Sequence, residues 1–296
     1  MYLTKISVVI PIFNHAEYVI ECLASVVDQC DDNFEIVAID DGSIDASYEN
    51  AMMYLSCNLI STKWSISKRE NRGINRTLNE AIQSSTGEII YLLASDDRMS
   101  AGSLKQIRQA YINEEDRCRL FFYDVALIRW DGTLMNPSAS SARPGGAALL
   151  GLSRIHLVAQ MVFSWGSPFA HQFYSREYYN THGPYLEELK YEDLYFALNS
   201  IAIDRFIFIP VVLKEYRLRK NQTQTPGLTF SDLDQTNIEV RRKFIKSKNL
   251  IYSTILLVGY LRFIVKSACA KYFLRKIASI IQRSILIVTL IRIRFF

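Results

Sequence analysis

The first 130 residues alternate short apolar segments with helical patterns, and this alternation restricts the fold more than any other feature of the chain. The segments SVVIPI (residues 7–12), FEIVAI (34–39), WSISK (64–68) and EIIYLLAS (88–95) are typical of buried strands. Strands that alternate with helices form parallel βαβ units. We therefore predict an α/β fold with a mostly parallel central sheet and helices on both of its faces.

Local signals predict how some of these elements begin and turn. Asn14, followed by Glu17, is predicted to be the N-cap of the first helix. Further along, residues 119–135 predict a hairpin that turns at Asp131-Gly132. Residues 205–218 predict one more extended strand.

The net charge of +4 is divided unevenly along the chain. Residues 250–296 contain eight basic side chains and no acidic one, whereas residues 1–249 carry the other 26 basic side chains against all 30 acidic ones. The body is therefore mildly acidic. A general nucleic-acid binder would carry its basic surface on the folded body, so no nucleic-acid partner is expected.

The basic tail predicts contact with a membrane. Its longest uncharged stretch, residues 249–261, has 13 residues, and a spanning helix needs about 20. Apolar clusters separated by single basic residues are typical of amphipathic helices that lie on an anionic membrane surface. The alternative is a pair of helices docked on the body.

Cysteine usage and the N-terminus favour the cytoplasm. The five cysteines are odd in number and no two have CxxC spacing, which argues against a disulfide framework or a structural zinc site. The apolar run near the N-terminus is short and contains Pro11, so it is predicted to be a strand and not a secretory leader. We expect a cytoplasmic protein that is peripheral at the inner face of the cell membrane.

Two pairs of acidic residues follow predicted strands. Asp40-Asp41 comes after the second strand and Asp96-Asp97 after the fourth, and carboxyl ends of parallel strands share the edge where ligands bind. An aspartate there can simply form a turn or a cap, but two pairs at one edge suit a divalent cation that carries phosphate. Neither GxxxxGK[ST] nor GxGxxG occurs, which disfavours P-loop enzymes and dehydrogenases.

Three segments resemble the donor-binding half of family 2 glycosyltransferases, which have the GT-A nucleotide-diphospho-sugar transferase fold. They are SVVIPIFNHAEYVIECLASVVDQ, FEIVAIDDGSIDAS and NRGINRTLNEAIQSSTGEIIYLLASDD, in that order. GPYLEELKYEDLYFALNSI and IPVVLKEYRLRKNQTQT resemble later segments of the family. The resemblance implies a donor-binding half (1–130), an acceptor-binding half of the same domain (131–230) and a basic tail of amphipathic helices (231–296).

The resemblance also implies a nucleotide-diphosphate sugar as donor. Asp41, with Asp40 beside it, would contact a uracil or thymine base, and Asp96 and Asp97 match the DxD element that holds Mn²⁺ or Mg²⁺ against the diphosphate. Ala94 stands where the common DxDD form has its first aspartate. The positions implied to bind the nucleotide sugar are Pro11, Phe13, Asn14, Asp40, Asp41, Asn71, Gly73, Ser95, Asp96, Arg217 and Arg219.

For catalysis the resemblance points to Glu192-Asp193, with Asp193 matching the family's general base. A carboxylate within hydrogen-bond reach can take the proton of an acceptor hydroxyl, and direct attack by that hydroxyl implies inversion at the anomeric carbon. The alternative is an acidic pair that only complements a helix N-terminus.

These expectations together predict an inverting, metal-dependent glycosyltransferase of hexosyl or N-acetylhexosaminyl type. It would use a UDP- or dTDP-sugar and a glycan or lipid-linked acceptor, in surface polysaccharide biosynthesis. The alternative is an inactive sugar-nucleotide or glycan-binding protein, which gains support from Ala94 and from Arg219, where family members often have a histidine. A nucleotidyltransferase would need a glycine-rich, basic N-terminal loop, which is absent.

Overall fold

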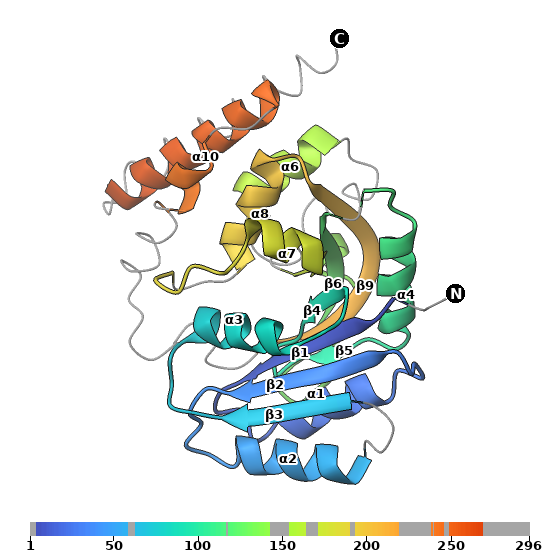
Figure 1. Cartoon of the computed structure of the whole chain (residues 1–296). Helices are drawn as coiled ribbons and strands as arrows, with labels where there is room; N and C mark the ends of the chain where they lie inside the picture. Colours follow the sequence, from blue (N-terminus) through green and yellow to red (C-terminus); the bar gives the residue numbers. More distant parts are fainter. Residues whose placement is uncertain are drawn as a thin grey trace.

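The strands form a single sheet that continues through both halves of the chain (Figure 1). Its strand order is β3-β2-β1-β4-β8-β6-β9-β5, and β7 pairs with β6 outside this path. The computed structural model describes residues 4–58, 63–116, 118–142, 154–163, 171–189, 193–218, 238, 240–245 and 249–268.

The N-terminal half has the predicted βαβ architecture. Its strands pair in parallel in the order β3-β2-β1-β4. Alternate residues of β1 face opposite sides: Val9 packs with α3, whereas Val8 and Ile10 pack with α1 and α2. The elements are β1 (Ile6–Ile12), α1 (Val19–Val27), β2 (Phe34–Asp40), α2 (Ser47–Asn58), β3 (Lys63–Lys68), α3 (Ile74–Ser84) and β4 (Ile89–Leu92).

The second half of the sheet is mixed, so the prediction of a mostly parallel sheet holds only for the first half. β8 lies between β4 and β6 and is antiparallel to both, and β9 is parallel to β6 and antiparallel to β5. The predicted hairpin at Asp131-Gly132 is confirmed by the antiparallel pair of β6 and β7. The strands are β5 (Arg98–Met99), β6 (Leu120–Arg129), β7 (Leu134–Asn136), β8 (Gln172–Ser175) and β9 (Phe206–Leu218).

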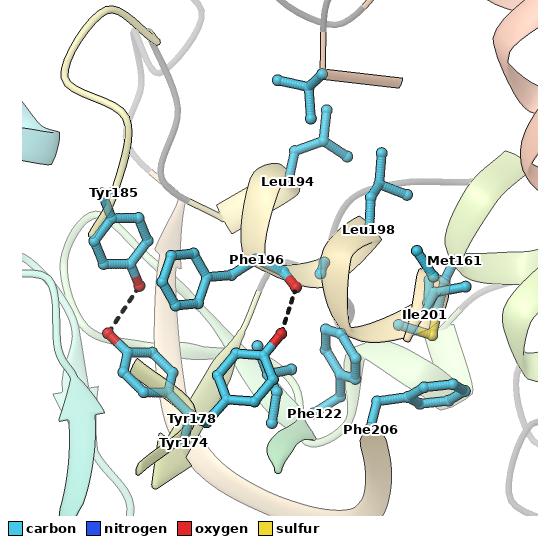
Figure 2. Close-up of a cluster of buried hydrophobic side chains, with 14 of the residues drawn as sticks. Phe122, Met161, Tyr174, Tyr178, Tyr185, Leu194, Phe196, Leu198, Ile201 and Phe206 are labelled. Atoms are coloured by element: carbon cyan, nitrogen blue, oxygen red, sulfur yellow. Dashed lines mark hydrogen bonds between the residues drawn. The ribbon is translucent and has the colours of Figure 1, made fainter. Parts of the chain in front are cut away.

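Helices of the second half pack on the sheet through a core rich in tyrosine and phenylalanine (Figure 2). The hydroxyls of Tyr174 and Tyr185 are 2.9 Å apart, and the Tyr178 hydroxyl donates to the Phe196 carbonyl. These bonds satisfy the polar ends of buried tyrosines and fix α7 and α8. The helices are α4 (Ser103–Ile112), α5 (Ala139–Ala142), α6 (Arg154–Phe163), α7 (Arg176–His182), α8 (Asp193–Ala202) and α10 (Leu250–Ala268).

The predicted N-cap at Asn14 is wrong. Helix α1 begins at Val19 with Tyr18 as its N-cap residue. Asn14 instead has a positive φ of 53°, and its side-chain oxygen accepts a hydrogen bond from the backbone of Ile44 at 3.0 Å. A tertiary contact with the loop after β2 therefore uses the side chain that the local pattern assigned to the helix.

Helix α10 lies on α6 and α8 (Figure 1). The buried face includes Tyr252 and Ile255, and a Cβ on Gly259 would meet Val162 at 2.3 Å, so the two helices approach closely there. The exposed large apolar side chains are Leu250, Ile251, Leu257 and Leu261. One helix of the predicted tail therefore packs on the body.

Most of the predicted tail, namely residues 231–237, 239, 246–248 and 269–296, lies outside the described residues. Within the part of the chain that the structure describes, no helix is both long and apolar enough to cross a membrane.

Candidate functional site

The two acidic pairs lie at the same edge of the sheet, as predicted. Asp40 is the last residue of β2, and Asp96 and Asp97 lie in the turn that follows β4. β1 runs between these two strands and is parallel to both. The carboxyl edge of the first half of the sheet therefore carries both pairs.

His15 joins the loops at this edge. Its backbone N–H donates to Ser47 Oγ at 2.7 Å, and its ring Nδ1 lies 2.8 Å from Ser95 Oγ and 3.8 Å from Asp96 Oδ1. Ser95, which was expected in the nucleotide pocket, is fully buried. Sequence reasoning missed His15, although its place in the polar loop three residues after a buried strand could have identified it.

Asp41 anchors the segment that contains two other predicted pocket residues. Its carboxylate accepts hydrogen bonds from the backbone N–H groups of Arg72 and Gly73, at 2.8 and 3.0 Å, and from the guanidinium of Arg69. Gly42 has a positive φ of 81°, and a Cβ there would meet the backbone nitrogen of Asn71 at 2.7 Å. The turn after β2 and residues 69–73 are thus in direct contact.

Asp97 is bound by strand β9. Its side chain is 1% exposed; Oδ1 accepts from the backbone of Arg217 and Oδ2 lies 2.9 Å from the ammonium of Lys214. Burial opposes a charged lysine here, but the Asp97 carboxylate raises the pKa of Lys214 above its ordinary value. A buried ammonium is therefore the positive group beside Asp97.

Arg217 is also built into the scaffold, and this placement is at odds with its expected contact to phosphate. The side chain is 1% exposed. Its guanidinium donates to the carbonyls of Asp96 (2.7 Å) and Trp130 (3.1 Å) and pairs with Glu21. It also lies over the ring of Tyr18, 4.8 Å from the ring centroid.

The expectation that carboxylates of both pairs surround one ion is not met. Among the described residues no group of three or more His, Cys, Asp and Glu side chains could hold a metal ion. Asp41 is occupied by Arg69 and Asp97 by Lys214. The carboxylate of Asp96 fits a metal that takes its other ligands from a diphosphate and from water, as Mg²⁺ commonly does.

Asp193 contacts the start of β8, which lies beside the carboxyl end of β4. It is the first residue of α8, and its carbonyl accepts a hydrogen bond from Gln172 Nε2 at 3.4 Å. Phe173 pairs with Tyr91 of β4, so Gln172 lies beside the end of that strand. The structure thus brings Asp193 toward the turn that carries Asp96. Glu192 and Arg219 lie outside the described residues.

Some of the buried polar atoms that have no hydrogen-bond partner among the described residues belong to residues at this edge. They include Asp40 Oδ2, His171 Nε2 and Gln172 Oε1. Burial, helped by the charge of Lys214, lowers the pKa of His171 well below its ordinary value, so its ring is neutral. Such groups are uncommon in folded proteins and are consistent with a site that receives a ligand.

The end of β1 carries three residues that were predicted for the nucleotide pocket: Pro11 in the strand, and Phe13 and Asn14 after it. Phe13 is 42% exposed directly after the strand, and Pro11 pairs with Ile39 of β2. An exposed aromatic ring at this edge is suited to stacking on a flat ligand. The residues predicted for the nucleotide pocket in segments 11–14, 40–41, 71–73 and 95–96 therefore belong to one edge of the sheet.

Residues 7–139 match the model of the glycosyl transferase family 2. Glycosyltransferase GlyG of Streptococcus pneumoniae serotype 4 is 31% identical over 112 residues, which cover 38% of this chain and 36% of GlyG. A PGL/p-HBAD biosynthesis glycosyltransferase of Mycobacterium tuberculosis is 29% identical over 131 residues, 43% of this chain and 50% of that protein. The matches thus span half or less of these curated relatives.

Two solved glycosyltransferases share the fold. S. aureus TarS 1–349 in complex with UDP-GlcNAc superimposes with a TM-score of 0.65 at 17% identity, over 88% of this chain and 72% of TarS. Mannosyltransferase PcManGT of Pyrobaculum calidifontis, in complex with GDP-Man and Mn²⁺, gives 0.59 at 16% identity, over 98% and 81%. The predicted GT-A fold and the resemblance to family 2 glycosyltransferases are confirmed.

Proposed function

We propose that this chain, which resembles the family 2 glycosyltransferases and has their GT-A fold, transfers a sugar from a nucleotide-diphosphate sugar to a hydroxyl of a glycan or lipid-linked acceptor. The observation that carries the proposal is the position of Asp96, in the turn after β4, and of Asp193, at the start of α8, where its carbonyl is bound by Gln172 of the neighbouring strand β8. A carboxylate for the donor and a carboxylate for the acceptor are what such a transfer requires.

The donor would bind across the ends of β1, β2 and β4. Structural neighbours bind UDP-GlcNAc and GDP-Man, which supports a sugar nucleotide, and we propose a UDP- or dTDP-sugar. Phe13 would lie against the base. The turn anchored by Asp41, with Asn71 and Gly73, would form the other side of the base and ribose pocket.

Asp96 would hold Mn²⁺ or Mg²⁺ against the diphosphate. Mn²⁺ accompanies the sugar nucleotide in the neighbour PcManGT, and a hard cation suits carboxylate and phosphate oxygens. When bound, the ion neutralises the charge that develops on the leaving diphosphate. Asp97 is not proposed as a ligand because its two oxygens face Arg217 and Lys214.

Asp193 would act as the general base. It would accept the proton of the acceptor hydroxyl as that oxygen attacks the anomeric carbon, and attack opposite the leaving diphosphate inverts the configuration. At the first residue of α8, its Oδ1 accepts a hydrogen bond from the Leu194 backbone at 2.7 Å. The helix N-terminus favours the ionised carboxylate that a base needs. Glu192, its predicted companion, is proposed only from the sequence.

The exposed side of α10 would contact an anionic membrane surface. Leu250, Leu257 and Leu261 lie outside the packed face of the helix, and residues 250–296 carry only basic charges. Apolar side chains together with basic ones bind anionic lipid surfaces. A lipid-linked acceptor and surface polysaccharide biosynthesis would agree with this location.

Release of the nucleoside diphosphate tests the proposal directly. The protein is incubated with UDP-, dTDP- and GDP-sugars, Mn²⁺ and extracts of lipid-linked acceptors, and the released diphosphate is measured. Asp193→Asn should lower kcat by about 10³-fold and leave the donor Kd unchanged. Glu115→Gln, an exposed carboxylate between α4 and β6, is the matched control.

Each result has a clear reading. An Asp193→Asn variant as active as the wild-type protein would overturn the role of Asp193. Metal-dependent donor binding without release, for every acceptor tried, would favour the alternative of an inactive sugar-nucleotide-binding protein.

A further inference from the structure

Lys214 lies in the interior of the protein, in contact with the turn that carries Asp96 and Asp97. It is 5% exposed, in β9. Its ammonium lies 2.9 Å from Asp97 Oδ2 and 5.7 Å from the ring centroid of Tyr216. Lysine is rarely buried unless it is paired, and neither the proposed base nor the proposed donor pocket requires this one.

The pair formed by Lys214 determines what Asp97 can do. Oδ2 faces the ammonium, and Oδ1 accepts the backbone N–H of Arg217 at 2.9 Å. Both contacts come from β9, so the carboxylate of Asp97 is part of that strand's packing. Removing one partner of such a buried pair leaves a charge without compensation, which is costly.

Asp96 is held differently although it is the adjacent residue. Strand β9 binds the main chain of Asp96, since the side-chain Nε of Arg217 donates to the Asp96 carbonyl at 2.7 Å. Its carboxylate lies on the side of the β1 loop, with Oδ1 3.8 Å from His15 Nδ1. The two neighbouring carboxylates therefore have separate surroundings.

We propose that Lys214 is a positioning residue for the metal–diphosphate site: it keeps the Asp97 carboxylate within the packing of β9, so that Asp96 alone of the pair meets the ion. The inference rests on the proposed function. Ala94 removes a further carboxylate from this turn. Because ion affinity depends on the number of ligand charges, the ion binds weakly alone and firmly with the diphosphate.

The decisive variant neutralises both members of the pair. Asp97→Asn combined with Lys214→Met leaves no uncompensated buried charge, so it should fold. Calorimetric titration with UDP, dTDP and GDP gives the ratio of the nucleotide Kd values without and with Mn²⁺. We expect a ratio of about tenfold or more for the wild-type protein, a ratio within about threefold of that for the double variant, and no Mn²⁺ effect for Asp96→Asn.

Melting temperature in Mn²⁺ alone provides the second measurement. Lys214→Met removes the cation from Asp97, so Mn²⁺ should stabilise this variant more than the wild-type protein. Lys105→Met, an exposed lysine on α4, is the control and should respond as the wild-type protein does. An equal response of all three proteins would overturn the inference. Should Lys214→Met not fold, the double variant decides.

Different results would overturn the proposed function and the inference about Lys214. If the wild-type protein binds no nucleotide in the presence of Mn²⁺, the proposed function is overturned and the inference with it. If the wild-type protein shows the Mn²⁺ effect and the double variant loses it as Asp96→Asn does, Asp97 is itself a ligand and the inference alone is overturned.

Discussion

The two edges of the sheet differ in whether every buried polar side chain has a partner. At the amino edge, Glu35 is 4% exposed and accepts hydrogen bonds from Ser7 Oγ (2.7 Å), Lys5 Nζ (2.8 Å) and the backbone of Gly87 (3.1 Å). Thr86 donates to it as well. At the carboxyl edge, Asp41 and Asp97 also have protein partners, but Asp40 Oδ2 and Gln172 Oε1 are buried and have no hydrogen-bond partner among the described residues.

This difference separates stability from function. A carboxylate whose oxygens all have donors contributes to folding and has no capacity left for a ligand. Buried acceptors without partners lower stability and are retained at sites that bind something. We therefore expect substitutions at the amino edge to change the free energy of unfolding, and substitutions at the carboxyl edge to change binding and turnover.

The largest expected effect is the loss of activity when Asp96 is replaced, and an unchanged activity would contradict the comparison of the two edges. Asp96→Asn should lower the rate of nucleoside diphosphate release by about 10²- to 10³-fold, because it removes the carboxylate proposed to hold the ion at the developing charge. Its melting temperature should stay close to that of the wild-type protein. Glu35→Gln, made in parallel, should retain its rate at a temperature where both proteins are folded. Equal losses of rate would contradict the division between the edges.

The second effect concerns stability at the amino edge. Burial alone would raise the pKa of Glu35, but hydrogen bonds from Lys5, Thr86 and Ser7 lower it from 4.5 to about 2. A lowered pKa stabilises the fold above the unfolded value of 4.5, and this contribution disappears as the pH falls through about 2. At one pKa unit per about 1.4 kcal/mol, the ionised carboxylate contributes about 3 kcal/mol at neutral pH.

Urea unfolding at several pH values measures this contribution. Glu35→Gln should be about 3 kcal/mol less stable than the wild-type protein at pH 7, and the difference should shrink as the pH falls from about 4.5 toward 2. Glu115→Gln, with its exposed side chain, is the control. A difference that does not depend on pH would show that Glu35 acts through its shape and not through its charge.

The smallest expected effect concerns α10, which has one face packed on the body and another that exposes apolar side chains. Leu257→Glu with Leu261→Glu should weaken binding to phosphatidylserine-containing vesicles by about tenfold, because two apolar side chains are replaced by negative charges. Met53→Glu on α2, an exposed apolar residue as well, is the matched control. Co-sedimentation with vesicles measures the binding. Unchanged binding of the α10 variant would remove the membrane from the proposal.

Local patterns predicted a large part of the fold. The four strands of the first half and the hairpin at Asp131-Gly132 were predictable because buried strands need runs of apolar residues and tight turns need particular residues. The mixed second half was not, since β8 enters the sheet between β4 and β6 from a distant segment. The N-cap at Asn14 failed because contacts with Ser43 and Ile44 replaced the local signal.

The sequence by itself determined the βαβ half, the two acidic pairs at its carboxyl edge and the family they resemble, because these depend on residues that are close along the chain. Only the tertiary structure decided how each carboxylate is used. Lys214 and Arg217 are 117 and 120 residues from Asp97; the sequence predicted no role for Lys214 and predicted contact with the nucleotide sugar for Arg217. Folding buries them against that aspartate, and burial makes the choice of partner decisive, because a charge removed from water must be compensated by a group that the fold brings to it.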